Sequence, residues 1–293
     1  MTLPRRRWTN LPPPIEGALW MAGAAFFWMC NTILIRPIAA DLPPIQLQFL
    51  RCLFSALMFT PFILRMGIGT LRTRRIGLYV LRAGAMAISM ICWIYAVVRM
   101  PMGEAVSLSF TAPLFATMMA ALILKEKVRI RRWSAVIIGF IGALVIIRPG
   151  FGHTSPYALL VFGSAACYSL YQIFTRYVAG VDRPETSVTY SALVGTVLLS
   201  AVVPFYWRAP ATLSHALVLI SLGLLGGLGH YCVARALLWG PASILSPFHY
   251  TQLILAALAG YIVFGDVPSV WTWAGAAIII GSGLHMVWRE TSR

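Results

Sequence analysis

The feature that most constrains this chain is a regular succession of apolar stretches, each about long enough to cross a bilayer, with short turns between them. Hydrophobic residues make up 59% of the 293 residues and charged residues 11%, whereas soluble domains average roughly 25% charged residues. A membrane-spanning helix needs about 20 mostly apolar residues. Because the runs are continuous rather than alternating, they favour helices over barrel strands. The sequence therefore predicts an all-α, polytopic membrane protein.

Ten transmembrane helices are expected. Their predicted ranges are Glu16–Ile35, Ile45–Leu64, Ile76–Val98, Gly103–Leu124, Trp133–Ile147, Tyr157–Tyr177, Thr186–Trp207, Ser214–Leu238, Ala242–Phe264 and Val270–Trp288. Residues 1–15 combine the run Arg5–Arg7 with Pro12–Pro14 and lack a cleavage-site pattern before the first apolar stretch. This segment is interpreted as a cytoplasmic tail rather than as a signal peptide.

The net charge of +15 is distributed unequally between the two predicted sides. With the N-terminus inside, the inner side holds Arg5–Arg7, Arg72–Arg75 and Lys125–Arg132 among others, whereas the outer side holds only Arg36, Arg99, Arg148 and Arg208. This positive-inside bias predicts that both termini are cytoplasmic, in a bacterial-type inner membrane. Basic loops beside anionic lipid explain the charge, so nucleic-acid binding is not expected.

The chain lacks the motifs of the commoner enzyme and cofactor sites. Its five cysteines lie in different apolar stretches, without a CxxC or Cys/His cluster, so no metal site is expected. There is no HExxH helix, GxSxG elbow or Walker loop, so neither an enzyme nor a cofactor is predicted. All eight carboxylates lie at span ends or in loops. Their absence from mid-span argues for facilitated movement or exchange, or for protons carried by His230 or His249.

The two halves of the chain share landmarks at a shift of 140 residues. The shift places Arg36 on Arg176, Pro101 on Pro241, Glu126 on Asp266 and Trp133 on Trp273. We therefore expect a first five-helix repeat over residues 16–150 and a second over 151–290. Because five is odd, the second repeat enters the membrane from the opposite side, as in many secondary transporters. Inverted repeats of this kind predict alternating access to a midplane cavity.

Several short motifs resemble EamA-type members of the drug/metabolite transporter superfamily. They are Phe49–Arg51, Tyr95–Ala96, Thr111–Leu114, Lys125–Glu126, Ser246–Phe248 and Phe264–Asp266. The resemblance implies a ten-helix transporter, most similar to bacterial amino-acid and metabolite exporters. One departure is that Pro247 lies early in its span whereas Pro113 lies near the middle of the corresponding span, which allows the halves to bend differently.

Candidate solute-binding residues are polar or aromatic side chains near the predicted midplane. They are Trp28, Asn31, Tyr95, Ser107, Phe110, Tyr168, Gln172, His230, Ser246, His249 and Tyr250, with Tyr171 on the same helix face as Tyr168. For each one, interhelical hydrogen bonding is the structural alternative. Pro113 and Pro247 are candidate hinges or fixed kinks. The glycines from Gly223 to Gly229 allow either close helix packing or room for a solute. Arg51 and Arg82 are expected to snorkel to the membrane surface.

An aromatic, uncharged lining suits a small amphipathic solute better than a bare ion. The first hypothesis is an amino-acid exporter that works as a monomer. The alternative is a carrier for a purine-containing metabolite, a nucleoside or S-adenosylmethionine, whose ring would stack on Trp28 or Tyr168. A pore is less favoured, because the sequence shows no repeated ring of charges.

Overall fold

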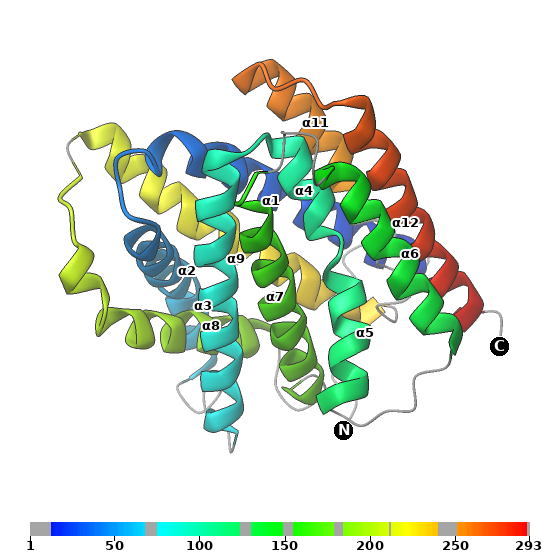
Figure 1. Ribbon diagram of the computed structural model, residues 1–293. Coiled ribbons are helices and arrows are strands. Elements are labelled where there is room, and N and C mark those ends of the chain that lie inside the picture. Colours follow the sequence, from blue (N-terminus) through cyan, green and yellow to red (C-terminus); the bar gives the residue numbers. More distant parts are fainter. Residues whose placement is uncertain are drawn as a thin grey trace.

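The computed structural model describes residues 13–67, 75–123, 130–148, 155–178, 184–210, 212–239 and 251–291. These residues form helices joined by short connections, and no strand occurs among them (Figure 1). The first half contains α1 (Pro13–Ile38), α2 (Pro44–Met66), α3 (Ile76–Arg99), α4 (Met102–Ser109), α5 (Ala112–Ile123) and α6 (Ile130–Ile147). The second half contains α7 (Ala158–Val178), α8 (Pro184–Ser200), η2 (Val203–Tyr206), α9 (Leu213–Trp239), α11 (Thr251–Phe264) and α12 (Val270–Thr291).

Within the described ranges, five helices are long and apolar enough to cross a membrane. They contain the candidate spans Ile15–Ile38, Pro44–Arg65, Ile76–Arg99, Ala158–Thr175 and Leu213–Ala236. Shorter apolar helical segments cover Ile137–Ile147, Gln252–Phe264 and Val270–Ser282. Large apolar side chains such as Leu159 and Val197 are exposed on the outside of the bundle, as expected of surfaces that face lipid. The structure thus agrees with an all-helical membrane protein, and the count of ten spans stays a prediction.

The predicted continuous helix Gly103–Leu124 is wrong. The chain breaks at Phe110 and Thr111 into α4 and α5. The backbone N–H groups of these two residues bond to carbonyls three positions earlier, at 3.3 Å to Ser107 and 3.0 Å to Leu108, which tightens the end of α4. Pro113 therefore lies in the first turn of α5, where its missing N–H group is tolerated, and not inside an unbroken helix. Flexing at this break stays a prediction.

The predicted span Thr186–Trp207 is too long. Helix α8 ends at Ser200, and the 3₁₀ turn η2 follows it. Pro204 disfavours α-helical geometry at the preceding residue, which explains why the α-helix does not continue to Trp207. Phe205 is 83% exposed and is followed by two more exposed aromatic residues. Aromatic residues at this position are typical of the interface between membrane and water.

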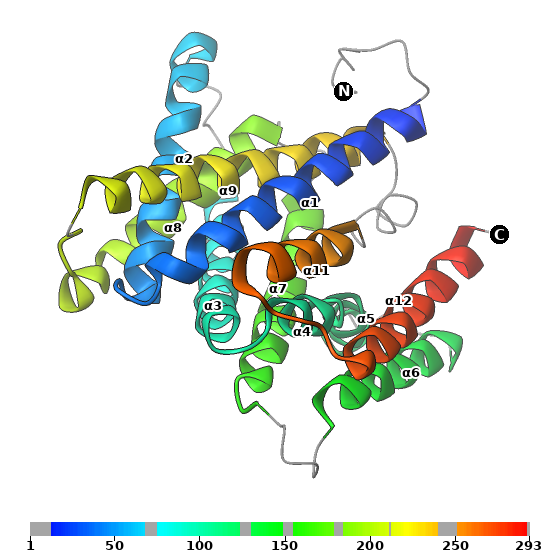
Figure 2. The ribbon, with the colours of Figure 1, turned by 90° about the horizontal axis from the view of Figure 1, so that it is seen from above.

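Helices of one half pack mainly on helices of the other half (Figures 1 and 2). Helix α1, the first of its half, lies along α9, and α7, the first of the other half, lies along α3. The first helix of each half thus contacts a later helix of the other half. Helix α2 contacts both α8 and α9, and α6 runs beside α12. A Cβ atom on Gly142 would lie 2.9 Å from the carbonyl oxygen of Gly275, so glycine permits close approach of α6 and α12.

Candidate solute-binding site

Both halves of the molecule contribute to one interior cavity of about 50 Å³. Its lining residues are Gln48, Arg51, Cys52 and Ser55 of α2, Met86 of α3, Tyr171 of α7, Val188, Ser191 and Ala192 of α8, and Gly226, Gly227 and His230 of α9. The volume is well below the roughly 300 Å³ that encloses a drug-sized ligand. The cavity as the structure has it is therefore too small to enclose such a ligand.

Arg51 is the charged group of this cavity. Its side chain is only 6% exposed, and its Nη1 donates a hydrogen bond to Oε1 of Gln48 at 3.3 Å, one turn earlier on α2. Its Nε has no hydrogen-bond partner in the described part of the chain. No ion pair joins Arg51 to a carboxylate among the described residues. A buried guanidinium without a counter-ion is unfavourable unless a bound group compensates it.

An aromatic cluster adjoins the cavity. The ring centroids of Trp28 and His230 are 5.4 Å apart, and those of Trp28 and Tyr168 are 6.3 Å apart. Tyr168 and Tyr171 stack at 5.6 Å with an interplanar angle of 21°, and Tyr171 lies 5.9 Å from His230. The cluster joins α1 of the first half to α7 and α9 of the second. Two of its members, Tyr171 and His230, line the cavity, and the other two pack behind them.

A second buried arginine holds Tyr171 in place. Arg82 of α3 is 3% exposed, and its Nη2 donates to the hydroxyl oxygen of Tyr171 at 3.0 Å. Its Nη1 donates to the hydroxyl oxygen of Ser187 at 2.5 Å, and its guanidinium carbon lies 4.8 Å from the Tyr171 ring centroid. Both Nη atoms of Arg82 thus donate to groups of α7 and α8, whereas its Nε, like that of Arg51, has no partner among the described residues. These contacts hold Tyr171 in the cavity wall.

Glycines of α9 make room for these side chains. A Cβ atom on Gly226 would lie 2.7 Å from Nε of Arg51, and one on Gly227 would lie 2.6 Å from the hydroxyl oxygen of Ser55. A Cβ atom on Gly229 would overlap the indole of Trp28. Gly226 and Gly227 also line the cavity. The glycines thus allow α9 to approach α2 closely and leave the guanidinium and the indole in place.

The predicted site residues divide into several groups. Trp28, Tyr168 and His230 meet in the aromatic cluster. Asn31 instead donates to the carbonyl of Leu222 at 2.7 Å, which is the structural alternative. Gln172 is exposed, and its side chain hydrogen-bonds that of Tyr168. Three other predicted residues lie elsewhere: Ser107 donates to the carbonyl of Gly103 within α4, Tyr95 lies beneath the guanidinium of Arg99, and Phe110 packs in the core. Ser246, Pro247, His249 and Tyr250 lie outside the described residues.

The expectation that Arg51 and Arg82 snorkel is wrong, because both side chains are buried. Hydropathy places each arginine one or two turns inside its span, and it does not reveal which way the helix face points. Two signals could have identified Arg51: a glutamine one turn earlier, and the absence of acidic residues from every mid-span position. Gln48, Ser55 and Ser191 were likewise not among the predicted site residues, although they line the cavity.

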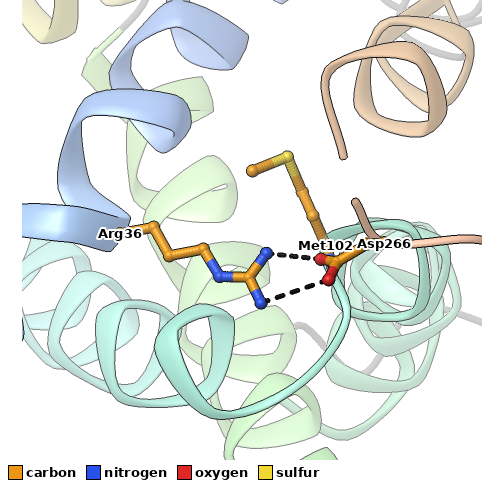
Figure 3. A network of polar contacts seen from close by, with 3 residues as sticks. All are labelled: Arg36, Met102 and Asp266. Atoms are coloured by element: carbon orange, nitrogen blue, oxygen red, sulfur yellow. Dashed lines mark hydrogen bonds and ion pairs between the residues drawn. The ribbon is translucent and has the colours of Figure 1, made fainter. Parts of the chain in front are cut away.

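At one end of the bundle, an ion pair ties the two halves together (Figure 3). Arg36, in the last turn of α1, pairs with Asp266 in the connection between α11 and α12. The backbone N–H of Met102, the first residue of α4, donates to the same carboxylate at 3.2 Å. The Arg36 guanidinium also lies 4.5 Å from the ring centroid of Phe264. The carboxylate at the start of α4 and the cation at the end of α1 both suit the helix dipoles.

Comparisons with known proteins agree with this arrangement. The sequence matches the EamA-like transporter family twice, over residues 15–148 and 155–288. It is 32% identical to a riboflavin transporter of Vibrio cholerae over 96% of this chain and 95% of that protein. It is 27% identical to an S-adenosylmethionine uptake transporter of Rickettsia prowazekii over 94% of both chains. A solved crystal structure that is 18% identical shares the fold, with a TM-score of 0.65 over 94% of this chain and 99% of that one. The chain therefore belongs to the EamA-like transporter family of the drug/metabolite transporter superfamily.

Proposed function

We propose that this transporter carries a planar, ring-bearing metabolite of the riboflavin class by alternating access to the cavity between its halves. The observation that carries the proposal is the aromatic cluster of Trp28, Tyr168, Tyr171 and His230 beside a cavity built by both halves. Aromatic side chains favour flat ring systems, with offset or edge contacts worth roughly 0.5–1.5 kcal/mol beyond burial. The similarity to a riboflavin transporter over nearly the whole chain supports the same class of solute.

The movement we propose is an exchange of conformation between two inverted repeats. The reciprocal contacts of α1 with α9 and of α7 with α3 support it, because such contacts can be remade when the halves trade conformations. The uneven distribution of basic residues supports cytoplasmic termini in an inner membrane. In this orientation the Arg36–Asp266 pair lies on the outer side. Labelling of a cysteine introduced at position 10 from outside intact cells would contradict the orientation.

S-adenosylmethionine is the second candidate, because a relative that is 27% identical bears that name. It fits less well, since its carboxylate can pair with Arg51 but its sulfonium and ammonium find no carboxylate among the described cavity residues. An amino acid, the first hypothesis from sequence, has a carboxylate for Arg51 but leaves its ammonium to aromatic faces. A flavin ring is neutral, so it is not repelled by Arg51 and needs no carboxylate in the cavity.

Counterflow in proteoliposomes tests the proposal. Vesicles that contain the protein and are loaded with unlabelled riboflavin should accumulate labelled riboflavin from outside. They should do so faster than vesicles that contain the protein but no internal riboflavin. Parallel arms use labelled S-adenosylmethionine and labelled leucine. If riboflavin shows no counterflow while leucine or S-adenosylmethionine does, the proposed solute is wrong. Counterflow of none of the three would remove all the candidates considered.

Aromatic substitutions connect this assay to the site. Trp28→Ala and Tyr168→Ala should each lower riboflavin counterflow at least tenfold, because each removes a wall of the cluster. Phe26→Ala is the matched control, since Phe26 lies on the same helix but is 54% exposed toward the outside of the bundle. Wild-type rates of counterflow in both cluster variants would show that the aromatic cluster does not bind the solute.

A further inference from the structure

The cavity holds a donor group that the fold leaves unused. Arg51 presents Nε and its two Nη atoms, and among the described residues Gln48 Oε1 accepts a hydrogen bond from Nη1 at 3.3 Å while Nε has no partner. The guanidinium fork favours a planar partner that offers two adjacent acceptors in one plane. Arg82, by contrast, is bonded to Ser187 and Tyr171. Of the buried arginines Arg51, Arg82 and Arg235, Arg51 is the one that lines the cavity.

The surroundings of Arg51 limit what that partner can be. The guanidinium is flanked by Gln48, Ser55 and Ser191, which are neutral, and by the ring of His230. On the α9 side the guanidinium occupies the place that a side chain at position 226 would take, because a Cβ atom on Gly226 would lie 2.7 Å from Nε and 3.1 Å from Nη2. The ring of Tyr171 also lines the cavity. The geometry suits a ring whose edge meets the guanidinium while its face meets the tyrosine.

We propose that Arg51 recognises a planar edge with two adjacent hydrogen-bond acceptors on the solute. In a flavin this edge is N1 and O2 of the pyrimidinedione ring, whose electron density a nearby positive charge stabilises. The inference rests on the proposed function, because it assigns a role within the same cavity. The solute edge supplies the hydrogen-bond acceptors that the described chain does not provide, and Arg82 acts through Tyr171 as a positioning residue.

Equilibrium binding to purified full-length protein in detergent tests this role independently of transport. The probes are riboflavin and lumiflavin, which has the same N1 and O2 acceptor edge without the ribityl chain, and the binding of each is followed by quenching of its fluorescence. Arg51→Met should weaken the binding of both at least tenfold, and Arg51→Lys should weaken it about threefold, since lysine keeps the charge but loses the fork. Arg99→Met is the matched control, because Arg99 is exposed at the end of α3, and it should bind as the wild type does.

The outcomes separate this inference from the proposed function. Wild-type affinity of Arg51→Met for both probes would overturn the role of Arg51. If that variant does not fold, Arg51→Lys and Gln48→Met decide, and unchanged affinity in both would likewise overturn it. Indole-3-acetate is the third probe and presents a carboxylate edge. Arg51-dependent binding of this probe without binding of either flavin probe would contradict the riboflavin proposal but support Arg51 as the acceptor-edge site. Binding of none of the three probes to the wild type would contradict both.

Discussion

Arg36 and Arg51 lie on consecutive helices of the same half but in opposite electrostatic situations. The Arg36 side chain is 20% exposed and has a carboxylate of the other half as its partner. Arg51 is more deeply buried, yet the acceptor that it bonds is a neutral amide. An ion pair compensates the burial of the Arg36 charge, whereas no carboxylate among the described residues compensates that of Arg51. The first arginine therefore fastens the halves, and the contrast supports our proposal that the second binds a solute.

Supplying Arg51 with a counter-ion in the chain should have the largest effect on transport. Gln48→Glu places a carboxylate where the amide oxygen already lies 3.3 Å from Nη1. A charge-assisted bond worth about 1.5–3 kcal/mol would then compete with the solute, which corresponds to a loss of roughly 10- to 100-fold. The measurement is riboflavin counterflow per reconstituted protein. Gln48→Met, which adds no charge, should lose far less, and equal losses would contradict the electrostatic explanation.

Filling the space beside Arg51 should have the next largest effect. Gly226→Ala puts a methyl group 2.7 Å from Nε, so the guanidinium must move out of the cavity. We expect an approximately tenfold fall in transport. Thermal stability should fall slightly, because α9 packs against α2 through the same glycine face. Gly84→Ala is the control, because a Cβ atom there has nothing within 4 Å. A normal rate in Gly226→Ala would show that the position of Arg51 is not critical.

The ion pair at the end of the bundle should tolerate exchange of its charges. Arg36→Asp and Asp266→Arg each create a like-charge pair, and each should slow transport several-fold because closure at that end is disfavoured. The double variant restores opposite charges and should recover much of the rate. A double variant slower than either single one would show that other contacts, such as that of Met102 N–H with the carboxylate, dominate.

A pH gradient should have the smallest effect. No carboxylate lines the described cavity, and His230 packs against the rings of Trp28 and Tyr171. We therefore expect exchange without proton coupling, and a gradient of one pH unit should change the initial rate less than about twofold. Stimulation of several-fold that disappears in His230→Gln would show instead that His230 carries protons.

The sequence was sufficient for the parts of the fold that depend on hydropathy. Most predicted spans agree with the helices within a few residues, because each apolar run is bounded by loops with charged residues or prolines. The break at Phe110 was missed, since it depends on packing and on backbone bonds to Ser107 and Leu108 rather than on composition. Pro113 marked the region of the break but not its geometry.

The site was less predictable than the fold. The sequence drew attention to Trp28, Tyr168 and His230 because aromatic and polar residues in mid-span stand out, and the structure brings their rings together. Arg51 was missed, since a charge near a span end can reach either water or the interior, and only helix rotation decides between them. Asn31 shows the opposite case. It was predicted to bind solute, but its side-chain amide donates a hydrogen bond to the carbonyl of Leu222 and so links α1 to α9.

Thermal unfolding of Arg51→Met and Arg36→Met, both without solute, tests the central claim most directly. Arg36→Met removes one partner of an ion pair, and the remaining Asp266 should make the protein less stable by about 1–3 kcal/mol, a fall of several degrees in Tm. Arg51→Met removes a buried charge that no described carboxylate compensates, so its Tm should equal or exceed that of the wild type. A Tm of Arg51→Met as low as that of Arg36→Met would contradict the account, because Arg51 would then be a structural residue rather than one reserved for the solute.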